Sequence, residues 1–271
     1  MKTIWFRLRP ILCLGAWLLC GAATTEGAPG RPGAARDRYF IASDGVRLHY
    51  LEAGSTLAHT IVFVPGWTMP AWIWAEQIAA FGRAWHVVAF DPRGQGASEI
   101  APGGYTPARR GRDIAELVAR VSPAPVVLVA WSLGVLDTLA YVHEHGDRAV
   151  AGLVLIDNSV GEPPPPSPGR GMFRRLPHAV FMQRFVRGLF REPQPAAYLD
   201  RLTEAALRTP EAASRALLSY AEPREYWRET LLATPRPVLY VVRPRFAAQA
   251  ANLERERPST QIAEFDHAGH A

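Results

Sequence analysis

The stretch over residues 126–134, Val-Val-Leu-Val-Ala-Trp-Ser-Leu-Gly, most constrains how this chain can fold. Its five leading apolar residues are typical of a strand buried on both faces, and the run breaks at Ser132. Ala130 and Gly134 flank the serine at a distance of two residues, which lets a strand and a helix pass close together at a sharp turn. We therefore predict a strand, a turn and a helix that expose the Ser132 hydroxyl at the carboxyl end of the strand. An ordinary strand end is the alternative.

The front of the chain is typical of an export signal. Three basic side chains open it: Lys2, Arg7 and Arg9. An apolar run over residues 11–19 and small residues at 21–23 follow, so we predict a signal peptide over residues 1–23 and a secreted or periplasmic protein. The run is shorter than the ~20 residues that span a bilayer, so we expect no stable membrane span after cleavage. A lipoprotein anchor at Cys20 is less favoured, because a leucine precedes this cysteine.

The charge and cysteine content of the remaining chain exclude several classes of function. Both cysteines, Cys13 and Cys20, lie inside the predicted signal, so disulfide, zinc-thiolate and cysteine-nucleophile chemistry are not expected. Without Lys2, Arg7 and Arg9, the 30 basic residues fall to 27 against 25 acids, and this near balance implies no nucleic-acid partner. We predict neither a metal nor a cofactor. A chain of 271 residues with 48% hydrophobic content can bury one sizeable core.

The order of the predicted elements indicates an α/β fold. After a flexible leader over residues 24–37, an Asp-Gly turn at residues 44–45 joins two apolar runs into a hairpin, in which His49 is expected to point outward. Buried strands and helices then alternate, which predicts a mostly parallel, doubly wound sheet with helices on both faces. The predicted strands cover residues 60–64, 86–90, 126–130, 151–156, 237–242 and 260–265. This core comprises residues 38–160 and 233–271.

A helical insertion interrupts the predicted sheet. Residues 162–168 are rich in proline and cannot join a helix interior or a sheet. The segment that follows carries helical patterns without a strand, so we predict a helical cap over residues 161–232, inserted between two strands. An ordinary pair of core helices is the alternative interpretation, but the proline hinge favours a separate lid.

Two loops at strand ends complete the predicted site. The strand over residues 60–64 ends in Pro-Gly-Trp, and Gly66 allows a tight turn that aims the backbone N–H of Trp67 above Ser132. The N–H of Leu133 would be the second donor to a developing oxyanion. The loop over residues 91–98, Asp-Pro-Arg-Gly-Gln-Gly-Ala-Ser, is expected to be stiff and to frame the site without a catalytic group.

With these motifs in this order, residues 38–271 resemble the α/β-hydrolase superfamily, in particular its capped branch of proline iminopeptidases, non-haem haloperoxidases and bacterial esterases. The resemblance rests on the turn at 65–67, the loop at 91–98, the serine turn at 131–134 and Ala-Gly-His at 268–270. It implies Ser132 as nucleophile, His270 as general base, and the amides of Trp67 and Leu133 as oxyanion donors. A serine hydroxyl needs such a positioned imidazole to become nucleophilic. His267 is the competing base.

The acid of the triad departs from the common pattern. Relatives usually carry it after the strand that here ends at Val242, but Arg-Pro-Arg-Phe follows. Haloalkane dehalogenases are similar members that place the acid after the preceding strand, where Asp157 stands, and the order Ser, acid, His is then kept. Asp157 could instead only cap its turn, and Glu162 is a further candidate. Relatives also continue past the histidine into a final helix, so two expectations stay open: a piece of a longer chain, or a loosely held His270.

These features predict a serine hydrolase that acts on a carboxylic ester or similar small acyl substrate. Trp131, Trp72 and Phe181 are the candidate residues of an apolar substrate pocket, with packing between cap and sheet as their alternative role. A serine at the turn, where epoxide hydrolases and haloalkane dehalogenases have aspartate, argues against both activities. Amidase or peptidase, lactonase and perhydrolase chemistry stay open. A catalytically inactive protein that binds a ligand or partner is the alternative from another class.

Overall fold

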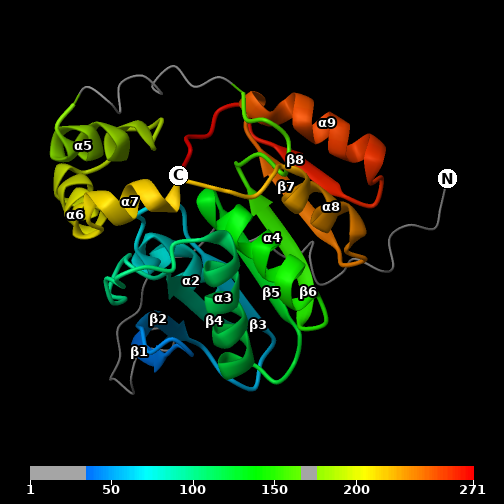
Figure 1. Ribbon diagram of the computed structural model, residues 1–271, viewed down its shortest axis with the longest axis horizontal. Coiled ribbons are helices and arrows are strands. Elements are labelled where there is room, and N and C mark those ends of the chain that lie inside the picture. Colours follow the sequence, from blue (N-terminus) through cyan, green and yellow to red (C-terminus); the bar gives the residue numbers. More distant parts are fainter. Residues whose placement is uncertain (1–34, 166–175) are drawn as a thin grey trace, which may run out of the picture. The chain divides into compact units, whose positions relative to one another are not determined.

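A mixed sheet of eight strands organises the part of the chain that the computed structural model describes, residues 35–165 and 176–271 (Figure 1). The predicted signal peptide lies outside these residues. The strands are β1 (Arg36–Ile41), β2 (Arg47–Ala53), β3 (Thr60–Val64), β4 (His86–Asp91), β5 (Val126–Trp131), β6 (Val150–Ile156), β7 (Val238–Val242) and β8 (Gln261–Glu264). They lie in the order β1-β2-β4-β3-β5-β6-β7-β8. β2 pairs antiparallel with both β1 and β4, and the other neighbours are parallel. The predicted α/β fold with a mostly parallel sheet is confirmed.

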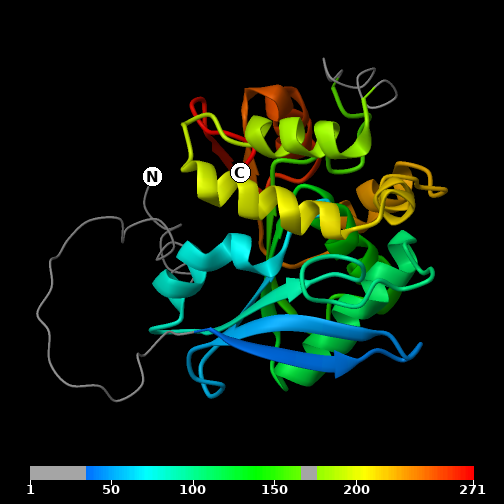
Figure 2. The same cartoon turned by 90° about the vertical axis from the view of Figure 1, so that its left-hand side faces the viewer.

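Helices cover both faces of this sheet. They are η1 (Ala71–Trp74), α2 (Ala75–Phe81), α3 (Pro107–Val121), α4 (Leu133–His145), α5 (His178–Gly188), α6 (Ala196–Arg208), α7 (Glu211–Leu217), α8 (Glu225–Ala233), η3 (Pro244–Phe246) and α9 (Ala247–Glu256). α4 packs against both α3 and α8 on one face, and α2 lies on the opposite face (Figures 1 and 2). Because parallel strands connect through helices, the carboxyl ends of the parallel strands β3 to β8 meet at one edge of the sheet.

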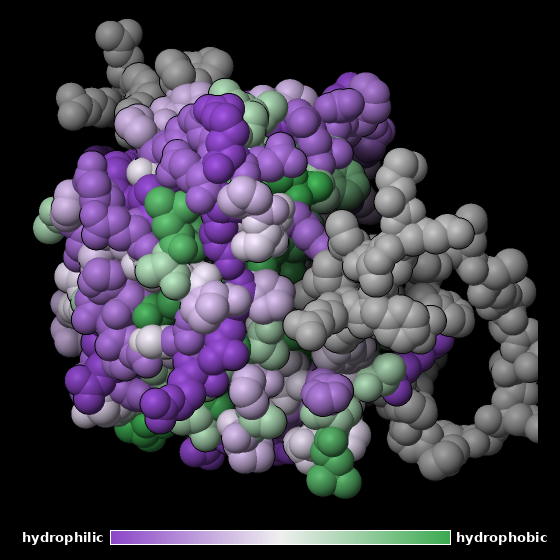
Figure 3. All heavy atoms as spheres, turned by 90° about the vertical axis from the view of Figure 1, so that its right-hand side faces the viewer, coloured by the Kyte–Doolittle hydropathy of each residue, from purple (hydrophilic) through white to green (hydrophobic). Residues whose placement is uncertain are grey.

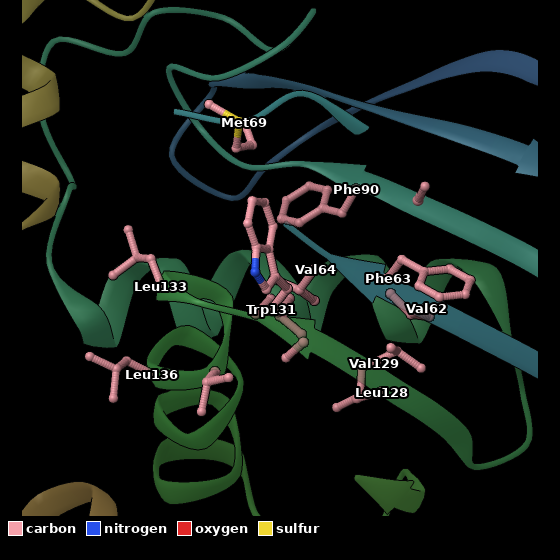
Figure 4. Packing of buried hydrophobic residues seen from close by; sticks show 14 of the residues in the cluster. Val62, Phe63, Val64, Met69, Phe90, Leu128, Val129, Trp131, Leu133 and Leu136 are labelled. Atoms are coloured by element: carbon pink, nitrogen blue, oxygen red, sulfur yellow. The ribbon is translucent and has the colours of Figure 1, made fainter. Parts of the chain in front are cut away.

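The central strands are buried because they carry continuous apolar runs. All five residues of β3 and all six of β4 are buried, as expected for a parallel sheet covered on both faces. Figure 4 shows side chains of β3 and β5 packed together with Leu133 and Leu136 of α4. β5 therefore enters the serine turn from a rigid position, and α4 leaves it buried along most of its length.

Among the described residues between β6 and β7, the regular elements are all helices. α5, α6 and α7, which we call the cap helices, gather on one side beyond the strand ends (Figures 1 and 2). α8 differs, because Trp227 is buried against α4 and its indole N–H donates to the carbonyl of Leu136 over 3.0 Å. α8 thus belongs with the core packing, although the cap predicted from the sequence extends to residue 232. At the other end, β1 begins at Arg36, inside the predicted leader.

One prediction about the hairpin is wrong. His49 does not point to solvent but is only 3% exposed, and its ring contacts two carboxylates. Nδ1 lies 2.7 Å from Asp91 and Nε2 lies 3.0 Å from Asp37. Alternation along β2 gives the face that His49 occupies, but it does not reveal that neighbouring acidic side chains cover that face.

The surface of the described residues is mixed in character. Figure 3 shows a face on which apolar patches are small and separated by hydrophilic side chains. Within residues 35–165 and 176–271, every helix is too short or too polar to cross a bilayer.

Candidate active site

Ser132 stands at the turn between β5 and α4, as the sequence predicts. Its backbone adopts φ 54° and ψ −122°, a region that few residues other than glycine occupy. Gly134 is required for the turn, since a Cβ at this position would lie 2.6 Å from the carbonyl oxygen of Val64. This crowding at Gly134 favours the predicted serine turn over the alternative of an ordinary strand end. The strained backbone presents the serine side chain at the carboxyl edge of the sheet.

The imidazole of His270 lies beside this hydroxyl. Its Nε2 is 2.9 Å from Oγ of Ser132, and its Nδ1 contacts the carboxylate of Asp157. Because a carboxylate can only accept, these contacts assign the hydrogen to Nδ1 and leave Nε2 to accept from the serine hydroxyl. The competing histidine, His267, is exposed on the same loop. The structure therefore brings His270, and not His267, to the serine.

Asp157 follows β6 directly and is almost completely buried, with a side chain 4% exposed. Its backbone N–H donates to the carbonyl of Val241 in β7 over 2.8 Å, and its φ of 51° turns the chain at the edge of the sheet. Oδ2 faces both the His270 ring and the guanidinium of Arg243, whose Nε lies 2.7 Å away. Glu162, the further candidate, instead accepts from Asn252 over 2.9 Å.

Arg243 occupies the position after β7, where the sequence pattern lacked the expected acid. Its side chain is 28% exposed, and its guanidinium reaches back across the strand ends to Asp157. Nη2 lies 3.4 Å from Nδ1 of His270. The sequence showed this arginine only as a departure, because a contact between residues on neighbouring strands is not visible in either segment alone.

The loop that carries His270 is fixed by its backbone. The N–H groups of His270 and Ala271 donate to the carbonyl of Leu189 over 2.7 and 3.0 Å, and the indole N–H of Trp131 donates to the carbonyl of His270 over 2.5 Å. Gly269 permits this approach, since a Cβ there would lie 2.7 Å from the Leu189 oxygen. The expectation of a loosely held histidine does not fit these contacts.

The predicted oxyanion turn lies over the serine. A Cβ on Gly66 would lie 3.0 Å from the Cβ of Ser132, so the backbone that leads to Trp67 passes close to the serine side chain. The next residue, Thr68, has φ 60°, which is unusual for a β-branched residue. Leu133, the other predicted donor, is the first residue of α4, where backbone N–H groups lack partners within the helix.

Two polar side chains that sequence reasoning did not assign to the site support these turns. The side chain of Gln95 is buried, and its Oε1 accepts from the N–H of Thr68 over 2.6 Å. Its Nε2 donates to the carbonyls of Gly66 and Met69 over 3.3 and 3.4 Å. Asn158 donates to the carbonyl of Ser132 over 2.7 Å. The stiff loop around Gln95 was the available signal, although nothing in it indicated that the amide reaches the oxyanion turn.

The predicted pocket residues separate into two groups. A cavity of about 290 Å³ is lined by Trp131 and reaches Asp157, Arg243 and His270. Trp72 and Phe181 do not line this cavity. Trp72 packs against Tyr198 and Arg201 of α6, and Phe181 packs against Trp67, with ring centroids 6.2 Å apart. Their side chains therefore contact cap helices or the oxyanion turn, which is the packing role that the sequence left open. No group of three or more possible metal-ligating side chains occurs in the described ranges.

Comparison with known proteins agrees with this architecture. A non-heme haloperoxidase from Rhodococcus erythropolis is 34% identical over 119 residues, which are 44% of this chain and 43% of that protein. The N-formylmaleamate deformylase of Pseudomonas putida is 29% identical over 131 residues, 48% of this chain and 46% of the relative. The chain thus matches less than half the length of these curated relatives.

Solved structures extend the similarity of fold over most of the chain. An esterase from Rhodococcus sp. ECU1013 superposes with a TM-score of 0.71 at 23% identity, covering 87% of this chain and 92% of the other. An esterase from Exiguobacterium antarcticum gives 0.73 at 17% identity, covering 86% and 92%. The model of the alpha/beta hydrolase family matches residues 61–271. The chain therefore belongs to the alpha/beta hydrolase family.

Proposed function

We propose that this protein is a serine hydrolase that cleaves a carboxylic ester or a similar small acyl substrate through an acyl-enzyme. The observation that carries the proposal is the continuous contact from Ser132 Oγ through the ring of His270 to the carboxylate of Asp157. Each group has the partner that its role demands: the nucleophile faces a base, and the base faces an orienting anion.

In this mechanism the Ser132 oxygen attacks the carbonyl carbon while Nε2 of His270 takes the hydroxyl proton. The imidazolium that forms is stabilised by Asp157, which keeps its negative charge. The negative carbonyl oxygen would accept from the N–H groups of Trp67 and Leu133. When the tetrahedral intermediate collapses, His270 gives its proton to the leaving alcohol. Water, deprotonated by the same imidazole, then releases the acid and restores the serine.

Amides form a second candidate substrate class, because the relative from Pseudomonas putida is named a deformylase of N-formylmaleamate. The same groups serve this reaction, since Nε2 of His270 can protonate a departing amine as well as an alkoxide. Lactones and peroxide-dependent acyl transfer use the same acyl-enzyme. A panel of substrates decides among them.

Labelling with a fluorophosphonate and hydrolysis of p-nitrophenyl esters of rising chain length test the proposal. We expect Ser132→Ala to lose both labelling and turnover. Asp157→Asn should lower kcat by up to ~10⁴-fold, because a neutral amide neither fixes the tautomer of His270 nor stabilises its imidazolium. His270→Gln should be inactive, whereas the control His267→Gln keeps wild-type rates. An intact wild-type protein that neither labels at Ser132 nor hydrolyses any ester would instead be a ligand-binding member of the family.

We further propose that the protein acts outside the cytoplasm after removal of residues 1–23, because the charge and hydropathy pattern of that segment fits an export signal. N-terminal sequencing of the protein recovered from the periplasm or medium tests this. A chain that stays in the cytoplasm with Lys2 and the apolar run intact would contradict it.

A further inference from the structure

The two oxygens of the Asp157 carboxylate differ in their hydrogen-bond partners. It is almost fully buried, yet both recorded donors, Nδ1 of His270 and Nε of Arg243, meet the same oxygen, Oδ2. The other oxygen, Oδ1, is buried and accepts no hydrogen bond within the described residues. A buried carboxylate with a single neutral donor would favour its protonated form, which cannot orient a histidine in the same way. The arginine therefore supplies the positively charged partner of this buried carboxylate.

Backbone pairing fixes where the arginine stands. Ile156 and Val241 are partners in the parallel pairing of β6 and β7, so Asp157 and Arg243 follow neighbouring strands at the same edge. The bond from the N–H of Asp157 to the carbonyl of Val241, 2.8 Å long, continues this pairing beyond the last strand residues. The contact between the two side chains is consequently part of the sheet edge and does not depend on the cap helices.

The same guanidinium also faces the base. Nη2 lies 3.4 Å from Nδ1 of His270. A guanidinium has donors only, so it cannot bond a ring nitrogen that already carries the hydrogen shared with Asp157. Its positive charge then opposes the formation of a positive imidazolium, while the charge of Asp157 favours it. The two charges act on the ring in opposite directions.

Few other charged groups face this ring. Asp266 and His267 belong to its own loop and are exposed, and Arg191 reaches the loop only at the carbonyl of Asp266, over 3.4 Å. Tyr198 from α6 and Gln77 from α2 line the same cavity but are uncharged near neutral pH. Arg243 is thus the cation in direct contact with the Asp157 and His270 pair among the described residues.

On the basis of the proposed hydrolase function, we propose that Arg243 is a positioning residue of this site. It holds the Asp157 carboxylate oriented toward Nδ1, and its charge offsets that of Asp157 at the His270 ring, so that removing this charge should move the acid limb of the reaction to higher pH.

The variants Arg243→Met and Arg243→Lys test this role, with Arg245→Met as the matched control. Arg245 is exposed two residues further on and donates to the carbonyl of Pro165 instead. The measurement is kcat/KM for a p-nitrophenyl ester from about pH 5 to about pH 9, which spans the range in which histidines titrate. Arg243→Met should lower the plateau about tenfold and move the acid limb up by about one pH unit, because a nearby cation is lost. Arg243→Lys keeps the charge and should restore the acid limb but not the full plateau, and Arg245→Met should match the wild type.

The outcomes separate this proposal from the function on which it rests. A wild type that neither hydrolyses esters nor labels with a fluorophosphonate overturns the hydrolase proposal itself. An active wild type whose rate and acid limb are unchanged in Arg243→Met overturns the role of Arg243 alone. A uniform loss of rate in both Arg243 variants, without any movement of the acid limb, shows a merely structural role and equally rejects the proposal. If Arg243→Met does not fold, judged by its thermal unfolding, Arg243→Gln takes its place, since it keeps polarity and removes the charge.

Discussion

Replacing Gly269 with alanine tests how firmly the backbone of the histidine loop must be held. The added Cβ would lie 2.7 Å from the carbonyl oxygen of Leu189 and 2.8 Å from the nitrogen of Arg191. An ordinary contact begins at 3.4 Å, so the loop must move away by about 0.7 Å. Overpacking of this kind typically costs about 1–3 kcal/mol, and the movement strains the bond from His270 N–H to the same oxygen.

The displacement carries the catalytic ring with it. Because a misplacement of ~1 Å can cost ~10²-fold in rate, we expect Gly269→Ala to lower kcat/KM by about 10- to 100-fold. The assay is ester hydrolysis together with the rate of fluorophosphonate labelling, and thermal unfolding measures the loss of stability. Gly188→Ala is the matched control on the last residue of α5, where a Cβ meets nothing within 4 Å. Wild-type kinetics in Gly269→Ala would refute the argument that the loop is held by this close approach.

Two further perturbations probe the turns beside the site. Gln95→Leu removes the acceptor that holds Thr68 at φ 60°. We expect kcat to fall by about 10²-fold with little change in KM, as when an oxyanion donor is lost. A raised KM with unchanged kcat would contradict this. For His49, burial opposes protonation, but the hydrogen bonds and charges of Asp91 and Asp37 outweigh it and raise the pKa above its ordinary value. The stability that this ring contributes is complete below about pH 6.5 and is lost as the pH rises through the raised pKa. Urea unfolding should therefore show a steeper fall in the free energy of unfolding with pH in the wild type than in His49→Gln, and equal slopes would speak against it.

The sequence was most informative where local chemistry alone decides the structure. The serine turn requires small residues at fixed distances from Ser132, since a Cβ at Gly134 would lie 2.6 Å from the carbonyl oxygen of Val64 in β3. Long apolar runs identified the parallel strands, since such strands are buried on both faces. These features are encoded in a few consecutive residues, and the structure agrees with the predicted elements there.

The rest could not be predicted because it depends on contacts between distant residues. Arg243 appears in the sequence as a missing acid, and its role depends on Asp157, which lies 86 residues earlier. His49 fits an outward strand residue by its sequence pattern, but in the fold it pairs with Asp91 of β4 and its ring contacts that carboxylate. In both cases the periodicity of one segment gives the direction of a side chain but not its partner. Polar partners on different strands can therefore be identified only in the folded structure.

The position of the base couples the cap helices to the core. The carbonyl of Leu189, immediately after α5, accepts from the backbone of both His270 and Ala271. A lid opening that moved Leu189 away would break two hydrogen bonds, each worth about 0.5–1.5 kcal/mol, and would release the loop that carries the base. If the cap opens to admit a substrate, the movement must therefore hinge beyond Leu189, leaving the end of α5 in place. A cap motion that included the end of α5 would instead break both bonds and displace His270 from Ser132.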